Sequence, residues 1–447
     1  MIKRILKKFK SKINKLRSLF IQTFFGHYHL RTHFLEHQNK HEINLQNVKD
    51  KIKKQKKIKI VFLDIDFGLF HFSSLYEELK NYESIEPLLF VYSEIGNGEF
   101  DAEEARERYN KRVEAGFNSF LAYDNENNPI PIEATKPDII FYSHYQTATD
   151  SVDNHYIRRA VSNTLSCLVA YYILSLKANV PKLFIHKNVI SSWVQFLDNK
   201  HEHNLSLQNT VTNGTNTVVS GHLSRDIVDN SVIDKTLEKL KNKRKIIIYA
   251  PHWGPYAPFY KVANDILSLL KKYPDIGFVL KPHSALYLRT FNKNTPDKVT
   301  NGWRYSDWER YKNEWTESEN GVMITESDSA NLFSKCDILI NESESYILGW
   351  ASTEKPCIQF YQSCNSKKDP KITRFSYAND VANSYYVANT FSDVEKYLKA
   401  LVIDNNDFKK EEREKVTKEF KIKEGSSSAK FIAKYLLEKL EIYKEEV

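Results

Sequence analysis

The chain has 447 residues, of which 41% are hydrophobic and 27% are charged, and its formal net charge is +8. At about 150 residues per domain, this length predicts two or three domains with ordinary globular cores. The low numbers of glycine and proline, 13 of each, and an aromatic content of 13% exclude a fibrous chain and argue against a largely disordered one.

The amino-terminal segment carries the positive charge. Residues 1–60 contain 17 Lys and Arg against 3 Asp and Glu. Within residues 1–20, apolar side chains recur at helical spacing and Lys and Arg fill the other faces, which predicts a basic amphipathic helix. Such a helix would bind an anionic membrane surface, to which each Lys or Arg contributes about 1 kcal/mol. Docking of this helix on its own protein is the main alternative, and we expect no nucleic-acid partner.

A row of histidines follows, each four positions after the last: His29, His33, His37 and His41. On a helix, this spacing would let two imidazoles share a metal ion. The simpler interpretation is that the histidines face solvent or a partner, because the HExxH motif is missing and the row turns by about 40° per step. We therefore predict no metal site in this segment.

Two series of short β-branched and aromatic runs come next, separated by stretches with helical spacing. The first series predicts strands at residues 58–65, 87–94, 137–144, 181–188 and 215–222. The second predicts strands at residues 245–252, 275–283, 321–327, 337–343 and 356–361. Nearly continuous apolar strands that alternate with helices are typical of parallel sheets covered on both faces. The sequence thus predicts an α/β fold with two doubly wound, Rossmann-like halves, joined near residues 225–244, and an amphipathic helix at residues 425–440.

The cysteines indicate a reducing compartment, and the apolar stretches indicate that no helix crosses a membrane. The four cysteines include no CxxC pair, which disfavours a zinc site or a disulfide framework. The longest nearly apolar stretch, residues 165–176, is shorter than the length of about 20 residues that crosses a bilayer. The amino terminus also lacks the pattern of a secretory signal. We expect a cytoplasmic protein without a transmembrane helix, held peripherally at the inner face of the cell membrane.

Polar side chains stand at the ends of the predicted strands, where ligands bind in open α/β sheets. IIIYAPHW (246–253), FVLKPHS (278–284) and the segment 334–361, together with VVSGHLSRDIV (218–228), resemble the CDP-glycerol glycerophosphotransferase family of teichoic-acid and capsule polymerases. The resemblance covers about residues 180–440. It implies a GT-B architecture, in which the two Rossmann-like domains face a cleft.

The charge pattern, the two series of strands and the resemblance together predict four regions of the chain. A basic membrane-associating segment would cover residues 1–57, an acceptor domain residues 58–230 and a nucleotide-donor domain residues 231–404. Helices in residues 405–447 would close the structure.

The resemblance assigns catalytic roles to His186, as the base that accepts the acceptor proton, and to His283. It places the donor on Lys281, His252, Ser343, Ser345 and Glu344. The chemistry agrees with these roles, because a lysine and a histidine stabilise phosphoryl charge and a helix amino terminus favours an anion. Simpler interpretations are a Lys281 that extends to solvent, a structural histidine and ordinary helix capping by the serines.

Several residues depart from the family pattern. Lys187 stands in place of a glycine, His252 in place of a threonine and Ser284 in place of a proline, and Asn-Glu-Ser at 341–343 replaces Asp-Tyr-Ser. Glu342 and Glu344 would repel a phosphate dianion unless they turn away or hold a sugar or ribose hydroxyl. The donor could therefore differ from CDP-glycerol.

An aromatic segment at residues 284–320 contains three of the six tryptophans. Aromatic rings and arginines suit a carbohydrate or polyanionic acceptor. The spacing of Trp308, Tyr311 and Trp315 equally predicts the buried face of a helix.

We expect a transferase that moves glycerol phosphate, or a related polyol phosphate, from a CDP-activated donor to a hydroxyl of a growing capsule, teichoic-acid-like or surface polysaccharide. No motif requires a metal, although Mg²⁺ could accompany the diphosphate. The closest alternative is a GT-B glycosyltransferase that uses a CMP- or UDP-sugar, and a non-catalytic scaffold of the capsule machinery is a third. Asp64 and Asp66 resemble the motif of a phosphatase, but the later strand ends lack the acidic pair that such an enzyme needs.

Overall fold

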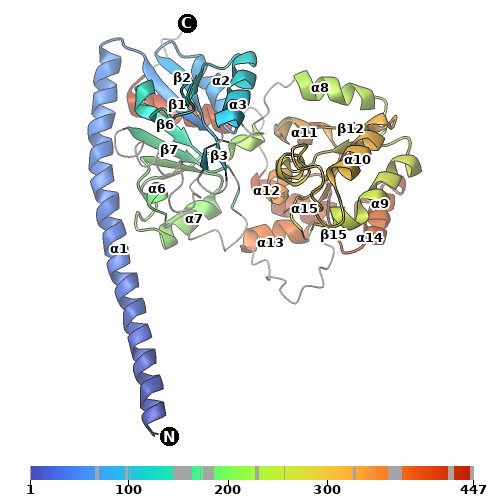
Figure 1. Ribbon diagram of the computed structural model, residues 1–447, viewed down its shortest axis with the longest axis horizontal. Helices are drawn as coiled ribbons and strands as arrows, with labels where there is room; N and C mark the ends of the chain where they lie inside the picture. Colours follow the sequence, from blue (N-terminus) through green and yellow to red (C-terminus); the bar gives the residue numbers. More distant parts are fainter. Residues whose placement is uncertain are drawn as a thin grey trace.

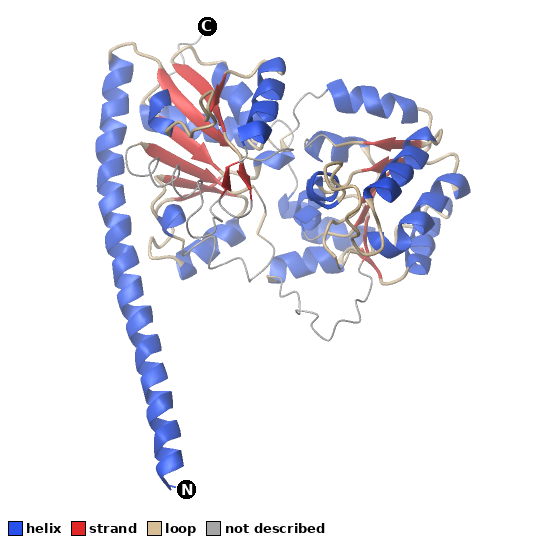
Figure 2. Ribbon diagram, in the orientation of Figure 1, coloured by secondary structure: helices blue, strands red, loops and turns tan. Residues whose placement is uncertain are grey.

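The computed structural model shows two parallel β-sheets, each surrounded by helices, and one long helix beside the first sheet (Figures 1 and 2). It describes residues 2–65, 70–95, 99–100, 102–143, 164–171, 173–174, 186–226, 231–255, 257–325, 329–343, 345–360, 375–420 and 427–442. The predicted fold class, with two doubly wound α/β halves, is confirmed. The domain boundaries at residues 57, 230 and 404 stay a prediction.

The first sheet has seven parallel strands in the order β5-β2-β1-β6-β7-β8-β9. The strands are β1 (Ile58–Asp64), β2 (Ile85–Val91), β5 (Ser119–Leu121), β6 (Ile139–Tyr142), β7 (Leu165–Val169), β8 (Val194–Leu197) and β9 (Thr217–Val219). All residues of β6, β7 and β8 are buried, which requires helices on both faces of the sheet. A separate antiparallel pair joins β3 (Glu94–Ile95) to β4 (Glu99–Phe100).

The second sheet has six parallel strands in the order β12-β11-β10-β13-β14-β15. The strands are β10 (Ile246–Ala250), β11 (Gly277–Leu280), β12 (Gly321–Met323), β13 (Ile338–Asn341), β14 (Cys357–Phe360) and β15 (Tyr386–Ala388). In the register, Tyr249 pairs with Leu280 and Ala250 pairs with Asn341. The ends of β10, β11 and β13 therefore lie next to one another at one edge.

The helices connect and cover these strands. They are α1 (Ile2–Lys53), α2 (Ser73–Lys80), α3 (Ala102–Glu114), α6 (Lys187–Ile190), α7 (Lys200–Asn209), α8 (Ser231–Leu237), α9 (Phe259–Lys272), α10 (Tyr305–Glu317), α11 (Ser329–Lys335), α12 (Ser345–Ala351), α13 (Ser376–Asn383), α14 (Phe391–Leu398), α15 (Lys410–Thr417) and α16 (Ser428–Leu440). Short 3-10 turns cover Ile132–Thr135, Leu223–Arg225, Glu238–Leu240 and Lys418–Phe420, and wider π turns cover Leu286–Thr290 and Lys399–Ile403.

The strand expected at residues 181–188 is wrong in its described part, because α6 begins at Lys187. Residues 181–185 lie outside the described residues. The sheet instead uses β7 and β8, neither of which is among the predicted strands. Periodicity cannot distinguish a short buried strand from a buried helical turn, and this ambiguity explains the error.

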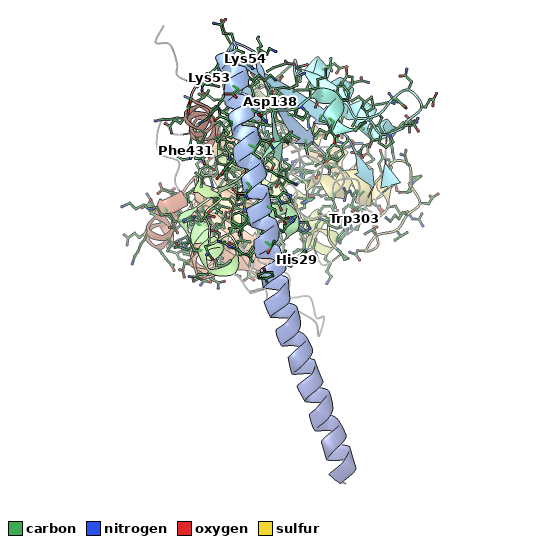
Figure 3. All side chains as sticks on the ribbon, turned by 90° about the vertical axis from the view of Figure 1, so that its left-hand side faces the viewer. His29, Lys53, Lys54, Asp138, Trp303 and Phe431 are labelled. Carbon is green, nitrogen blue, oxygen red and sulfur yellow. The ribbon has the colours of Figure 1, made fainter. Side chains whose placement is uncertain are left out.

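Helix α1 has 52 residues, and its carboxyl half packs against the first sheet and α6. Phe34, His37, His41 and Val48 form its buried face. Toward its amino terminus the helix extends away from both sheets (Figure 1), and Figure 3 shows His29 near the point where it leaves the rest of the molecule. Among the described residues, no helix is both long and apolar enough to cross a membrane.

Helix α16 confirms the amphipathic helix predicted at residues 425–440 and returns the chain to the first half. Its buried side chains include Ile432, Leu436 and Leu440, which join the core cluster of β1 and β2. The Asp226 carboxylate accepts hydrogen bonds from Ser428 N at 2.8 Å and from Ala429 N at 2.7 Å. This carboxylate satisfies backbone donors that the first turn of a helix leaves unpaired.

Candidate functional site

Three neighbouring strands of the second sheet bring the expected donor-binding residues together. Lys281 N donates to Tyr249 O at 2.8 Å, His283 N donates to Pro251 O at 3.2 Å and Glu342 N donates to Ala250 O at 3.3 Å. These backbone bonds continue the ladder just beyond the ends of β10, β11 and β13. The side chains that follow the three strands therefore share one edge, as the sequence predicts for a parallel sheet.

Two imidazoles and an indole group at this edge. The ring centroids of His252 and His283 are 5.6 Å apart, and those of Trp253 and His283 are 6.2 Å apart. His252 Nδ1 accepts a hydrogen bond from Gly254 N at 2.9 Å, and His283 Nδ1 accepts one from Ala285 N at 3.1 Å. A neutral imidazole whose Nδ1 is an acceptor carries its proton on Nε2. Both rings are thus arranged to donate from Nε2, as a phosphate ligand requires.

Burial keeps His252 neutral. Desolvation lowers the pKa of its imidazole from 6.5 to about 4. Its ring is therefore a hydrogen-bond donor at neutral pH and not a permanent charge.

Lys281 and Ser343 are buried at the same edge, with exposed fractions of 5% and 8%. This exposure contradicts the interpretation in which Lys281 extends to solvent. Ser343 N donates to Asn341 Oδ1 at 2.9 Å, and Asn341 Nδ2 donates back to Ser343 O. The Asn341 side chain thereby closes the turn that leads from β13 into α12.

Two expected donor ligands are only partly visible in the structure. Ser345 is the first residue of α12, but its side chain lies outside the described part of the chain, as does Glu344. Helix α12 has only seven residues. The dipole of so short a helix would attract an anion less than a full lysine charge would.

Glu342 takes an orientation that the sequence does not reveal. It is 6% exposed, and its carboxylate accepts hydrogen bonds from Tyr249 Oη at 2.6 Å and from the backbone N–H groups of His252 and Phe259 at 3.2 Å each. Burial raises the pKa of this carboxyl to about 7. The side chain points into the protein, which removes the expected repulsion of a phosphate at this position.

The expected strand before His186 lies outside the described residues, and His186 itself is half-buried. It directly precedes α6, and Ile190 N at the end of this helix donates to His186 O at 3.1 Å. Three residues later, Trp193 N donates to Ser166 O, close to the amino-terminal start of β7. The chain after His186 therefore leads through α6 to the amino-terminal edge of the first sheet. The catalytic role of His186 stays a prediction.

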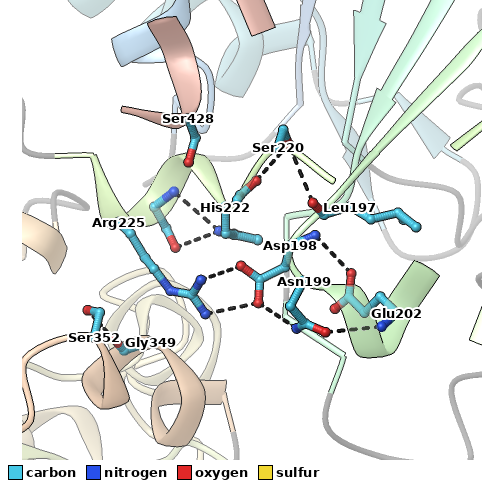
Figure 4. Close-up of polar contacts among 12 residues, drawn as sticks. Leu197, Asp198, Asn199, Glu202, Ser220, His222, Arg225, Gly349, Ser352 and Ser428 are labelled. Carbon is cyan, nitrogen blue, oxygen red and sulfur yellow. Dashed lines mark hydrogen bonds and ion pairs between the residues drawn. The ribbon is translucent and has the colours of Figure 1, made fainter. Parts of the chain in front are cut away.

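The carboxyl edge of the first sheet instead carries a buried polar network (Figure 4). Arg225 forms a bidentate ion pair with Asp198, the residue after β8, and its Nη2 lies 2.9 Å from Oδ2. Glu202 accepts hydrogen bonds from Leu174 N at 2.9 Å and from Asp198 N at 3.0 Å. Burial, together with the charge of Asp198, raises the pKa of Glu202 to about 8. The segment 218–228 contributed to the family resemblance, but the sequence had suggested no role for Arg225 or its partners.

Two further histidines, His71 and His222, lie at this carboxyl edge. His71 follows β1 and His222 follows β9, and their ring centroids are 5.2 Å apart. Burial lowers the pKa of His222 to about 3, and its Nδ1 accepts a hydrogen bond from Ser224 N. His71 is only half-buried. His71 and His222 could have been found from the sequence, because each follows a strand. The same criterion had been applied only to His186, His252 and His283.

The same edge contacts the second half of the molecule. Tyr377 Oη of α13 donates to Leu174 O, and the Tyr377 ring stacks on His201 with a centroid distance of 4.5 Å. His201 Nε2 lies 2.9 Å from the Glu419 carboxylate. A single hydrophobic cluster contains residues of both sheets. The two halves are therefore packed together and not merely linked by the chain.

A cavity of about 440 Å³ lies at this contact between α7, α13 and α15. It is lined by His201, Ser376, Tyr377, Asp380, Lys415, Val416, Lys418 and Glu419. Among the described residues, none of the expected donor ligands of the second sheet lines it. The cavity and the strand-end group of the second sheet are thus separate features.

The histidine row serves to dock α1. His33 Nε2 lies 2.6 Å from Ser191 Oγ, and His41 Nε2 donates to Ser191 O at 2.8 Å. His37 Nδ1 donates to His33 O at 2.8 Å. These three side chains face the protein itself, and His29 is exposed. In the described part of the chain, no three His, Cys, Asp or Glu side chains are grouped as metal ligands.

The aromatic residues at 308–315 and Asp64 are buried and have structural contacts. Trp308, Tyr311 and Trp315 lie in the core beside α9, so the buried-face interpretation of the aromatic segment is confirmed. Asp64 is buried and accepts a hydrogen bond from Arg112 Nε at 2.8 Å. Asp66 lies outside the described residues.

Comparison with solved structures supports the architecture. The wall teichoic acid polymerase TagF superposes with a TM-score of 0.57 at 12% identity, over 98% of this chain and 98% of that chain. A TagF variant soaked with CDPG gives a TM-score of 0.56 at 13% identity, over 87% of this chain and 90% of that one. The UDP-GlcNAc 2-epimerase from Neisseria meningitidis, bound to UDP-GlcNAc, gives a TM-score of 0.51 at 14% identity, over 85% of this chain and 100% of that one. At such identities the likeness establishes a GT-B-like fold. No family model matches the chain, and no curated protein matches its sequence.

Proposed function

We propose that this protein is a transferase that moves glycerol phosphate, or a related polyol phosphate, from a CDP-activated donor to a hydroxyl of a capsule, teichoic-acid-like or surface polymer. The observation that carries the proposal is the gathering of Lys281, His283, His252 and Ser343 at one edge of the second sheet. A buried ammonium group and two imidazole donors form an environment for a diphosphate. The full-length likeness to a teichoic acid polymerase adds support at the level of the fold.

In the proposed reaction, the acceptor oxygen attacks the β-phosphorus of the donor. The bond between this phosphorus and the oxygen that bridges to the α-phosphorus breaks, and CMP leaves with that oxygen. Lys281 and the Nε2–H groups of His252 and His283 stabilise the charge that develops on the phosphoryl oxygens. Because Nδ1 of His283 already accepts a backbone hydrogen bond, His283 acts here as a hydrogen-bond donor and not as a base.

The hydroxyl proton must pass to a base on the acceptor side. We place this base at the carboxyl edge of the first sheet, where His71 lies, because ligands of open parallel sheets bind beyond the carboxyl ends of the strands. An imidazole suits the role, since its ordinary pKa lies near neutral pH. His71→Gln should lower kcat far more than His186→Gln does, and the reverse result would restore the role first expected for His186.

A GT-B glycosyltransferase that uses a CMP- or UDP-sugar is the second candidate. It is favoured by the likeness to an epimerase bound to UDP-GlcNAc. Thermal shifts with CMP, CDP, UDP and CDP-glycerol would separate the candidates, since a ligand at about 100 times its Kd stabilises the protein by about 2.7 kcal/mol. Incorporation of phosphorus-labelled glycerol phosphate into polymer would support the first candidate. Incorporation of sugar without phosphorus would support the second.

We further propose that residues 1–20 hold the protein peripherally on the cytoplasmic face of the membrane. The basic amphipathic pattern of this segment and the extension of α1 beyond the two sheets support this placement (Figure 1). A membrane-bound polymer acceptor would then lie close to the enzyme.

A further inference from the structure

Glu342 is a buried carboxylate that the proposed reaction does not use. It is the first residue after β13, and it sits among aromatic side chains of β10, α9 and α10, with Tyr249, Tyr260 and Tyr311 as its titratable neighbours. A carboxylate in such a position is costly unless hydrogen bonds replace the lost water. The hydrogen bonds of Glu342 therefore indicate its structural role.

Those contacts connect both ends of one loop to the end of β13. Oε2 of Glu342 accepts hydrogen bonds from His252 N, at the start of the connection between β10 and α9, and from Phe259 N, the first residue of α9. Oε1 accepts the hydroxyl proton of Tyr249, within β10, at 2.6 Å. One side chain thus fixes the loop that carries His252 and Trp253 and also satisfies an amino-terminal donor of α9.

The direction of these hydrogen bonds shows whether Glu342 can act as a base or only position other groups. Both oxygens of Glu342 face donors of the protein itself, and the residue is 6% exposed. Such a carboxylate is not placed to accept a proton from an acceptor hydroxyl. It acts through the groups that it holds.

We propose that Glu342 is a positioning residue that holds the connection between β10 and α9, so that His252 and Trp253 meet the donor. The part of this inference that concerns the donor rests on the proposed function, whereas the part that concerns the loop does not. Hydrogen bonding, and not the negative charge, is the property of Glu342 that matters.

Two substitutions at this position test the proposal. Glu342→Ala leaves three donors without an acceptor and should release the loop. Glu342→Gln can keep the arrangement, because its amide oxygen can accept from the two backbone N–H groups while its amide nitrogen donates to Tyr249 Oη. We expect Glu342→Ala to raise the donor KM about tenfold or more with a smaller change in kcat, and Glu342→Gln to stay within about threefold of the original protein.

Hydrogen exchange of residues 251–259 gives a readout that is independent of turnover. Exchange should increase in Glu342→Ala and stay unchanged in Glu342→Gln. If the alanine variant does not fold, Tyr249→Phe takes its place, because it removes one of the three hydrogen bonds and should increase exchange in this loop by a smaller amount. The matched control is Tyr311→Phe, which removes a nearby buried hydroxyl that has no hydrogen-bond partner among the described residues.

Each result decides between the two proposals. Unchanged exchange in both Glu342→Ala and Tyr249→Phe, or equal losses in Glu342→Ala and Glu342→Gln, would overturn the positioning role. Hydrogen exchange of residues 251–259 could increase in Glu342→Ala while no cytidine nucleotide changes the stability of the protein. This result would leave the positioning role intact and count against the proposed function.

Discussion

At the scale of single residues, polar and charged side chains that are costly to bury lie together at one edge of the second sheet. Backbone hydrogen bonds hold the loops that carry them. Lys281, His252 and Glu342 lie beyond adjacent strand ends, where backbone bonds fix their loops. Nδ1 of each imidazole ring accepts a backbone hydrogen bond, so the ring proton is on Nε2. These details make the edge a candidate for phosphate binding and not for proton abstraction.

The charge of Lys281 should dominate donor affinity. Lys281→Met keeps the length of the side chain but removes a charge-assisted hydrogen bond, which is worth about 1.5–3 kcal/mol. We therefore expect donor affinity, measured by calorimetry, to fall by about 10- to 100-fold. Lys271→Met, on an exposed position of α9, serves as the control. Equal affinity in both variants would exclude Lys281 from the donor site.

Glu202 should make the protein less stable as pH rises. Burial and the neighbouring Asp198 raise the pKa of Glu202 from 4.5 to about 8. Between these values the folded state holds a proton that the unfolded state has released, so the contribution of Glu202 is lost as pH rises through about 8.

Urea denaturation from about pH 5 to about pH 9 measures this dependence. The free energy of unfolding should decline with pH in the original protein and decline less in Glu202→Gln, which cannot ionise. Glu412→Gln, at an exposed position of α15, should leave the dependence unchanged. Parallel curves for the original protein and Glu202→Gln would contradict the assignment.

At the scale of elements, α16 shows how the carboxyl terminus is joined to the first half. Its apolar face fills the core of β1 and β2, and Asp226 satisfies its first backbone donors. The segment 218–228 thus has a structural role in addition to its resemblance to a family motif.

Asp226→Ala should destabilise the protein by about 2 kcal/mol, because a cap and its hydrogen bonds are lost at a buried helix start. The midpoint of urea denaturation gives the measurement. Asp404→Ala, which alters an exposed carboxylate, provides the comparison. A loss no larger than that of the control would show that packing of α16 alone holds the helix.

At the scale of the whole molecule, two packed α/β halves are combined with one helix that is partly independent of them. His33 and His41 dock the carboxyl half of α1 through contacts with Ser191, and His37 is buried beside them. The amino-terminal part of α1 extends beyond this contact (Figure 3). Membrane binding and donor binding should therefore be separable.

Deletion of residues 1–20 should remove binding to anionic vesicles and preserve the thermal shift by the donor. The basic segment contributes about 1 kcal/mol per charge near an anionic surface, and salt screens this attraction. Sedimentation with anionic vesicles, at low and at high salt, measures the effect, and neutral vesicles provide the control. Undiminished sedimentation of the shortened protein would refute the membrane role of this segment.

Local patterns were enough to predict most of the architecture. Apolar runs such as residues 246–250 and 338–341 are strands because both of their faces are buried, and the register then brings Lys281, His283 and Ser343 to one edge. The pattern at residues 425–440 likewise identified α16. These predictions depend on the periods of strands and helices, which short segments of sequence contain.

Other features depended on contacts between distant segments. The sequence by itself determined two parallel sheets, a basic amino-terminal helix and a group of polar residues at the strand ends of the second half. Only the tertiary structure decided that Glu342 turns inward to Tyr249 and that α16 packs on the first half. The physical reason is that the direction of a side chain and the partner of a helix are set by packing between segments that are far apart in the chain, which local periodicity does not encode.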